Sequence, residues 1–190
     1  MNLSLYDIQF LFEKHGASLY GGEAVTQLEH ALQTAALAES EGASHTLIAA
    51  SLLHDLGHII QVQQQETAGL DQEIDHRHQT FVLPFLQESL PDAVLEPIRM
   101  HVDAKRCLCA IDENYFSTLS PASVHSLELQ GGIFNNKQVE TFMQQPYAVD
   151  AIRLRRWDDL AKVPGQVTPD LAHFLSIVAN VQEIHALEKQ

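Results

Sequence analysis

An apolar stretch in the first third of the chain is interrupted by two histidines and an aspartate. In the run Ser51-Leu52-Leu53-His54-Asp55-Leu56-Gly57-His58, the two histidines stand one helical turn apart, and Asp55 lies about 100° round the helix from His54. Buried imidazole and carboxylate groups are unfavourable unless they are hydrogen-bonded or bind a metal. This stretch therefore predicts a helix that directs three polar side chains into one metal-binding cavity.

Further candidate ligands lie within apolar helical patterns elsewhere in the chain, namely His30, His101, Asp158 and one of His76 and His78. We favour His78 over His76, because His78 is in phase with Val82 and Leu86 at four-residue steps. Together with His54 and Asp55 these residues provide six ligands. Six protein ligands with a carboxylate that two ions can share indicate two metals, and imidazole with carboxylate and no thiolate fits iron, manganese or zinc.

Several of these residues also have simpler interpretations. A histidine at position 30 or 101 could be a core side chain that bonds a backbone carbonyl. Asp158, with Arg155 three residues before it and Lys162 four after, could belong to a row of surface ion pairs. Lys105, one turn after His101, is either a solvated charge or a contact for a metal-bound anion. Ser123 follows the helix start Ser120-Pro121 and could do no more than satisfy its first turn.

Size and charge limit the classes of protein that the chain can represent. Its 190 residues suffice for one domain with a sizeable core, which we place at residues 1–190. A net charge of −14 argues against nucleic acid as a partner, although a small anionic substrate is compatible with a metal site. The start of the chain lacks the pattern of a signal peptide, and no apolar run is long enough to span a membrane. We expect a cytoplasmic protein.

The spacing of apolar residues predicts an all-α fold, a single helical bundle. Intervals of three and four residues occur over 25–41, 44–60, 78–88, 93–111, 121–129, 137–144, 147–162 and 169–187. The polar segment 61–77 has no such period, and we predict a loop there that could cover the site. Cys107 and Cys109 are too close to form an ordinary disulfide within a helix, so we predict buried thiols.

The order of histidines and aspartates resembles the HD-domain superfamily of metal-dependent enzymes. The segment Tyr20-Gly21-Gly22-Glu23-Ala24-Val25-Thr26-Gln27-Leu28-Glu29-His30, read with the metal pattern, narrows this likeness. It resembles the PhnZ-type mixed-valent diiron oxygenases, which cleave the carbon–phosphorus bond of 1-hydroxyphosphonates. Segments 101–110, 119–123, 129–132 and 154–162 agree with it, and the likeness runs from about residue 18 to residue 170.

The resemblance implies roles for individual residues. One iron would be bound by His30, His54, Asp55 and Asp158, and the other by His78 and His101, with Asp55 as the bridge. The phosphonate oxygens would be held by His58, Lys105, Ser123 and Arg155. Tyr20 would shield the open iron position, and Glu23 would meet the ammonium of an amino-bearing substrate. With the Fe²⁺/Fe³⁺ pair and O₂, 2-amino-1-hydroxyethylphosphonate would give glycine and phosphate.

Two features depart from the family pattern. The helix after His78 carries Phe81-Val82-Leu83 where the family has a Gly-Ala pair, and Cys107 stands where the family often has tyrosine. The cysteine could alter the shape of the pocket and hence the substrate. The sequence does not choose among amino, N-methylated and uncharged side groups.

Two other functions compete with the oxygenase. A phosphohydrolase of nucleotides or small phosphate esters would use the same fold and metals, with a metal-bound hydroxide attacking phosphorus. A protein that senses a metal or an anion without turnover is the third possibility. Six ligands preceded by Tyr20 and Glu23 favour the oxygenase, because hydrolysis needs no protected open position for O₂.

Overall fold

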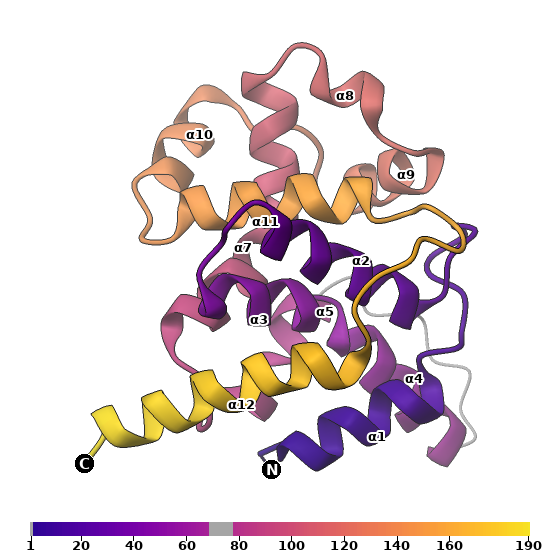
Figure 1. Cartoon of the computed structure of the whole chain (residues 1–190). Coiled ribbons are helices and arrows are strands. Elements are labelled where there is room, and N and C mark those ends of the chain that lie inside the picture. The colour runs from indigo at the N-terminus through magenta and orange to yellow at the C-terminus, as the bar shows by residue number, and fades with distance from the viewer. Residues whose placement is uncertain (1, 69–77) are drawn as a thin grey trace.

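Helices account for the regular secondary structure in the computed structural model, which describes residues 2–68 and 78–190 (Figure 1). The only other regular pairing in these residues is an isolated antiparallel bridge between Leu19 and Thr26. The all-α prediction is therefore confirmed. The helices are α1 (Leu5–His15), α2 (Gln27–Ser40), α3 (His45–Leu53), α4 (Leu56–Ala68), α5 (His78–Phe81), α6 (Leu83–Leu86), α7 (Asp92–Ile111), α8 (Tyr115–Thr118), α9 (Pro121–Leu129), α10 (Asn136–Met143), α11 (Ala148–Leu160) and α12 (Leu171–Glu188).

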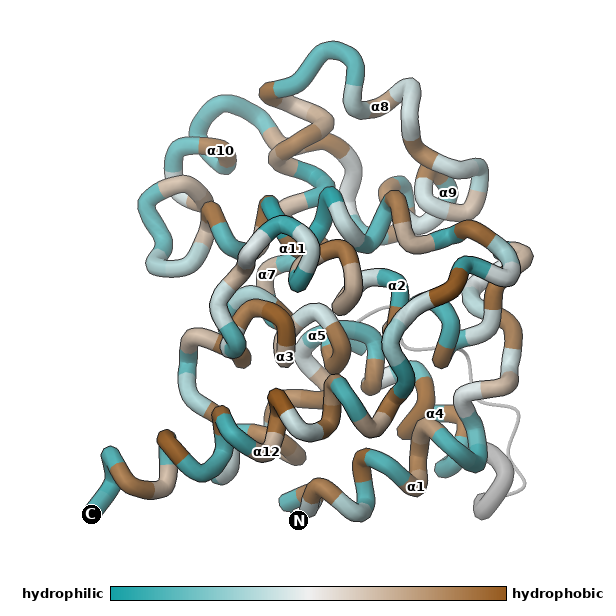
Figure 2. The backbone as a smooth tube through the Cα atoms, viewed as in Figure 1, coloured by the Kyte–Doolittle hydropathy of each residue, from teal (hydrophilic) through white to brown (hydrophobic). Residues whose placement is uncertain are grey.

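Helix α3 lies at the centre of the bundle and packs against α2, α7, α11 and α12 (Figure 1). Its residues from Leu47 to Leu53 are all buried, as expected for a helix that is apolar on every side. Around it, the main hydrophobic cluster includes large side chains such as Phe12, Trp157 and Phe174. Figure 2 shows the contrast with α12, along which hydrophilic and hydrophobic residues alternate because one of its sides faces solvent. The end of α3 therefore delivers His54 to the interior of the molecule.

A smaller hydrophobic cluster joins α7, α10 and α11 at the other end of the molecule (Figure 1). Cys107 is fully buried in this cluster with Met100, Ala104 and Phe142. The predicted buried thiol is confirmed for Cys107, whereas Cys109 is only partly buried. Cys107 therefore contributes to the core, and the expectation that it shapes the substrate pocket is not supported by its position.

The structure corrects several expectations about the helices. The predicted helix 78–88 is divided at Val82 into α5 and α6. The predicted helix 44–60 is broken at His54 and Asp55, which form a turn between α3 and α4, so these side chains do not project from one continuous helix. Residues 61–68, predicted as a loop, continue α4, since glutamine and glutamate favour helix even without an apolar period. Helix α1 was not predicted, although its start has a capping box formed by Ser4 and Asp7. His76 and the rest of the predicted loop lie outside the described residues.

Within residues 2–68 and 78–190, no helix combines the length and the apolar character needed to cross a membrane.

Gly57 permits the close approach of α4 and α5. A Cβ atom built on Gly57 would lie 2.3 Å from the backbone oxygen of His78 and 3.0 Å from its carbonyl carbon. Real side chains do not tolerate such contacts with backbone atoms, so only glycine allows His78 to come this near to the turn at Asp55.

We predict that Gly57→Ala lowers the free energy of unfolding by about 1–3 kcal/mol, because the added methyl group must push α5 away. Thermal and urea unfolding monitored by circular dichroism would measure the loss. Gly132→Ala is the control: its φ of 71° strains the backbone, but the site of the new methyl group is open. The control should lose stability without displacing His78, and an unchanged stability of Gly57→Ala would contradict the packing described here.

Candidate metal centre

Six buried side chains from five segments of the chain lie close together in one cluster. They are His30 from α2, His54 and Asp55 from the turn after α3, His78 from α5, His101 from α7 and Asp158 from α11. None exposes more than 6% of its surface. The structure thus brings together every ligand candidate of the sequence analysis among the described residues. The interpretation of Asp158 as part of a surface ion-pair row is wrong, since only 1% of it is exposed.

Backbone carbonyls fix the orientation of three of the four histidine rings. The Nδ1 atoms of His30, His54 and His101 lie 2.8, 2.9 and 2.7 Å from carbonyl oxygens of Ala161, Ser51 and Ile98. A carbonyl only accepts hydrogen bonds, so each Nδ1 carries a hydrogen and each Nε2 faces inward, where it can offer its lone pair to a metal ion. This tautomer is the one that a metal ligand requires.

The inward nitrogens meet in two pairs. The Nε2 atoms of His30 and His54 are 3.2 Å apart, and those of His78 and His101 are also 3.2 Å apart. Two lone pairs that face each other at this distance repel, unless a proton or a metal ion lies between them. The geometry therefore fits a cation at each pair.

Asp55 lies between the two histidine pairs and turns one carboxylate oxygen to each. Its Oδ2 is 3.4 Å from Nε2 of His54 and 3.7 Å from Nε2 of His30, whereas its Oδ1 is 3.0 Å from Nε2 of His78 and 3.6 Å from Nε2 of His101. Oδ1 is buried and makes no hydrogen bond within the described residues. An ionised carboxylate with an unsatisfied buried oxygen is what a bridging ligand needs.

Asp158 completes the first group of donors. Its Oδ1 lies 3.4 Å from Nε2 of His30, and its Oδ2 lies 3.9 Å from Nε2 of His54. Apart from Asp55, the first group has two imidazole nitrogens and a carboxylate, and the second has two imidazole nitrogens. Such donors are preferred by iron, manganese and zinc. His58 adds a further nitrogen near the second pair: its ring stacks on that of His78 with centroids 3.9 Å apart, and it can reach the same ion as Asp55 and His78.

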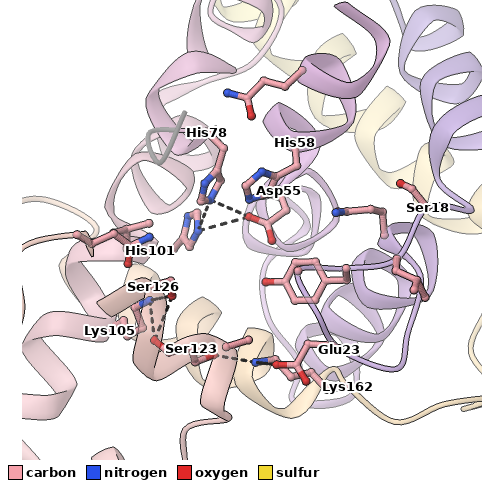
Figure 3. Close-up of a pocket in the computed structure, with 18 of the residues that line it drawn as sticks. Ser18, Glu23, Asp55, His58, His78, His101, Lys105, Ser123, Ser126 and Lys162 are labelled. Atoms are coloured by element: carbon pink, nitrogen blue, oxygen red, sulfur yellow. Dashed lines mark hydrogen bonds and ion pairs between the residues drawn. The ribbon is translucent and has the colours of Figure 1, made fainter. Parts of the chain in front are cut away.

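A pocket of about 300 Å³ opens beside Asp55, His78 and His101 (Figure 3). The other titratable side chains along its wall are Tyr20, Glu23, His58, Lys105, Arg155 and Lys162. An anion bound at the metal ions would therefore meet cationic groups of the protein in the same cavity.

The loop before α2 brings Tyr20 and Glu23 to this pocket. Gly21 and Gly22 adopt positive φ angles of 45° and 85°, which allow the chain to reverse between these two residues. The ring of Tyr20 stacks on His30 at a centroid distance of 3.8 Å, and its hydroxyl lies 3.4 Å from Oδ1 of Asp158. The carboxylate of Glu23 accepts a hydrogen bond from Ser120 and pairs with Lys162 at 3.2 Å.

Lys105 is held in the wall by hydroxyl and carbonyl groups. Only 2% of the residue is exposed, so its interpretation as a solvated surface charge is wrong. Its Nζ donates to Oγ of Ser126 at 2.7 Å and to the carbonyl of Ser123 at 3.4 Å (Figure 3). Burial and the nearby Arg155 lower the pKa of Lys105 to about 7. An anionic ligand would offset both effects and favour the charged ammonium.

Arg155 holds the carboxylate of Asp158 in position through an ion pair on the same helix, α11. Its Nη1 lies 2.7 Å from Oδ2 of Asp158, and the rest of the guanidinium bonds Asp159 and the hydroxyl of Tyr115. Although burial favours the protonated acid, Arg155 and His30 hold the pKa of Asp158 well below its usual range. Asp158 is therefore ionised and fixed in position toward the histidines.

Comparisons with known proteins agree with this geometry. The HD domain model matches residues 28–113, which contain five of the six candidate ligands. A hydroxymethylphosphonate dioxygenase of Gimesia maris is 44% identical over 173 residues, covering 91% of this chain and 85% of that protein. A [1-hydroxy-2-(trimethylamino)ethyl]phosphonate dioxygenase (glycine-betaine-forming) of Leisingera caerulea is 36% identical, covering 92% of this chain and 88% of the relative. The chain belongs to the PhnZ-type HD-domain family of phosphonate dioxygenases.

A third relative is an uncharacterised protein of Acanthamoeba polyphaga mimivirus. It is 31% identical over 169 residues, which cover 88% of this chain and 77% of that protein. The two relatives named as dioxygenases confirm the family resemblance inferred from the sequence over nearly the whole chain.

Ser126 and Lys162 are among the pocket residues that the sequence analysis did not assign to the site. Ser126 lies three residues after Ser123 on α9, and this helical spacing could have indicated that both face Lys105. Lys162 lies just after the end of α11, and the spacing of residues in the sequence gives no sign of its contact with Glu23, which is far away along the chain. Ser123 has a wider role than closing the first turn of α9, since its hydroxyl also accepts a hydrogen bond from Lys162 at 2.9 Å.

Protons compete with metal ions for the centre. Burial disfavours a charged ring at His54, but the carboxylates of Asp55 and Asp158 outweigh it and raise the pKa of His54 to about 9. Burial likewise favours the protonated form of Asp55, yet His54 and His78 hold its pKa well below the usual range. Near neutral pH the metal-free centre therefore holds a proton on His54, which an incoming ion must displace.

We predict that metal binding to the apoprotein releases close to one proton from His54 near pH 7, so that apparent affinity rises about tenfold per pH unit between pH 6.5 and 8. Anaerobic calorimetric titration with Fe²⁺ in buffers of different ionisation enthalpy measures the proton count. The His54→Ala variant supplies the control, because it lacks the displaced proton. An affinity that falls with rising pH would contradict the assignment.

Proposed function

We propose that this protein is an O₂-dependent dioxygenase that cleaves the carbon–phosphorus bond of a small 1-hydroxyphosphonate. The carbon bearing the hydroxyl becomes a carboxylic acid and the phosphonate becomes phosphate: R–CH(OH)–PO₃H₂ + O₂ → R–COOH + H₃PO₄. One O₂ accepts the four electrons, and both of its oxygen atoms end in the products. The observation that carries the proposal is the pair of histidine groups on either side of Asp55, beside a cation-lined pocket, in a chain similar to two phosphonate dioxygenases.

Two iron ions in the mixed-valent Fe²⁺/Fe³⁺ state are the proposed cofactor. One would be held by His30, His54, Asp55 and Asp158, and the other by Asp55, His78 and His101. When bound, such a pair supplies Lewis-acid positions for the hydroxyl and phosphonate oxygens of the substrate and electrons for reaction with O₂. Asp55 would hold the two ions at a fixed separation, since each of its oxygens faces one group.

We assign the phosphonate to the cationic wall of the pocket. Lys105 and Ser123 would donate hydrogen bonds to the phosphonate oxygens, and a charged donor in a site screened from water contributes strongly. His58 would donate from its neutral ring, because burial and His78 lower its pKa to about 3. Arg155 also lines the pocket, but its guanidinium is shared with Asp158, so it orients a metal ligand as well as adding positive charge.

Tyr20 and Glu23 would form the entrance. The stacking of Tyr20 on His30 supports a role in covering the first ion and limiting the access of water. A contact between Glu23 and a substrate ammonium, implied by the family resemblance, would require the ion pair with Lys162 to open. The cytoplasmic location and the lack of a nucleic-acid partner stay predictions from the sequence.

We predict that the iron-loaded enzyme releases phosphate from hydroxymethylphosphonate only when O₂ is present, with one O₂ consumed per phosphate. An oxygen electrode and a phosphate assay on the same sample measure this ratio. The phosphohydrolase alternative predicts phosphate release from a phosphate ester such as phosphoglycolate under anaerobic conditions. That second result, without any O₂-dependent release, would overturn the proposed function.

We also predict that Lys105→Met lowers kcat/KM by about 10- to 100-fold, because the phosphonate loses a charge-assisted hydrogen bond. Steady-state phosphate release measures this loss, with iron content determined on the same preparation. The control is Lys137→Met, which alters an exposed lysine of α10. Equal activity of both variants would remove Lys105 from the phosphonate site.

A further inference from the structure

Asp159 and Tyr115, which are not among the described residues that line the pocket, hold one edge of the Arg155 guanidinium. The carboxylate of Asp159 accepts hydrogen bonds from Nε at 3.1 Å and from Nη2. The hydroxyl of Tyr115, at the start of α8, accepts a hydrogen bond from Nε at 3.2 Å and donates one to Oδ2 of Asp159. Such a two-point contact with a carboxylate fixes both the position and the plane of a guanidinium.

The third nitrogen of the guanidinium is turned toward the metal centre. Nη1 pairs with Oδ2 of Asp158 at 2.7 Å, and the side chain of Arg155 forms part of the pocket wall. Oδ1 of Asp158 lies 3.4 Å from Nε2 of His30, within the first group of candidate ligands. A chain of direct contacts therefore runs from Tyr115 and Asp159, through Arg155, to a candidate metal ligand.

The guanidinium is thus shared between two carboxylates. Asp158 is buried beside the histidines, and only 11% of the side chain of Asp159 is exposed, so solvent screens these charges weakly. If Asp159 released its edge, Asp158 would be the remaining carboxylate partner of Arg155 in the contacts of the described residues, and Arg155 could turn further toward it. A guanidinium that bound both oxygens of Asp158 would compete with a metal ion for them.

We propose that Asp159 and Tyr115 are positioning residues of the metal centre: they hold Arg155 in an orientation that fixes Asp158 and leaves its carboxylate available to an ion. Both residues act through Arg155, and neither is assigned a contact with substrate. Partners that orient a ligand in this way typically change metal affinity or activity by about 10- to 100-fold when they are removed. The effect on metal binding is independent of the substrate, whereas the consequence for turnover rests on the proposed function.

Asp159→Asn tests the proposal, because an amide offers Arg155 one acceptor and turns an N–H donor against the guanidinium. Anaerobic calorimetric titration of the apoprotein with Fe²⁺ should show the Kd of one of the two ions rising by about 10- to 100-fold. The electron paramagnetic resonance signal of the mixed-valent pair should shift in its g values, since the surroundings of one iron change. With hydroxymethylphosphonate, kcat for O₂-dependent phosphate release should fall by about the same factor as the affinity.

Tyr115→Phe separates positioning from charge, since it removes one hydroxyl and leaves the net charge unchanged. We expect a smaller rise in the same Kd, about two- to tenfold. In an Arg155→Met background, Asp159→Asn should raise the Kd by no more than about twofold, because its effect passes through Arg155. Asp112→Asn is the matched control: Asp112 pairs with Arg156 at 2.9 Å on a partly exposed surface, and losing its charge should leave the Kd within about twofold of wild type.

A folded Asp159→Asn variant that binds both ions with wild-type affinity and gives an unchanged resonance signal would overturn the proposal, as would an equal loss of affinity in Asp112→Asn. If circular dichroism shows that Asp159→Asn does not fold, an unchanged Kd in Tyr115→Phe overturns it instead. Failure of the proposed function looks different, because the wild-type protein would then give no O₂-dependent phosphate release. The ion affinities of the variants still test the positioning role in that case.

Discussion

The position of Asp55 between two pairs of histidines is the constraint on which the rest of the molecule depends. Four imidazole rings and two carboxylates are buried within a few ångströms, and three of the rings are fixed by backbone carbonyls so that their lone pairs face inward. Such a cluster is unfavourable in an apolar interior unless cations neutralise it. Since each oxygen of Asp55 faces a different pair, one carboxylate links two halves of the centre that come from distant parts of the chain.

Local features of the fold serve this convergence. A capping box of Thr26 and Glu29 starts α2 one turn before His30. The turn at the end of α3 releases Asp55 from the helix, and Gly57 lets α5 approach closely enough for His78 to reach it. The glycine turn before α2 then places Tyr20 over His30 and Glu23 beside Lys162. Burying the polar side chains of the metal centre without ions is unfavourable, and the apolar core around α3 provides stabilising free energy that offsets this cost.

The helical fold and the set of candidate ligands that the structure brings together could be predicted because both follow from local patterns. Histidine and aspartate within apolar helical spacing have few favourable arrangements, and His30, His101 and Asp158 were identified in this way. The break at His54 was not predicted, since apolar residues continue through it in register. Residues 61–68 were wrongly predicted as a loop because they lack an apolar period, although glutamine and glutamate favour helix. The partnership of Glu23 and Lys162 joins residues far apart in sequence and could not be predicted from spacing.

The central claim is that Asp55 bridges two metal ions. A crystal structure of the iron-loaded protein, with anomalous diffraction data collected on both sides of the iron absorption edge, tests it most directly. We expect two anomalous peaks, one near His30, His54 and Asp158 and the other near His78 and His101, each within bonding distance of a different oxygen of Asp55. A single peak, or two peaks of which one lies beyond reach of Asp55, would contradict it.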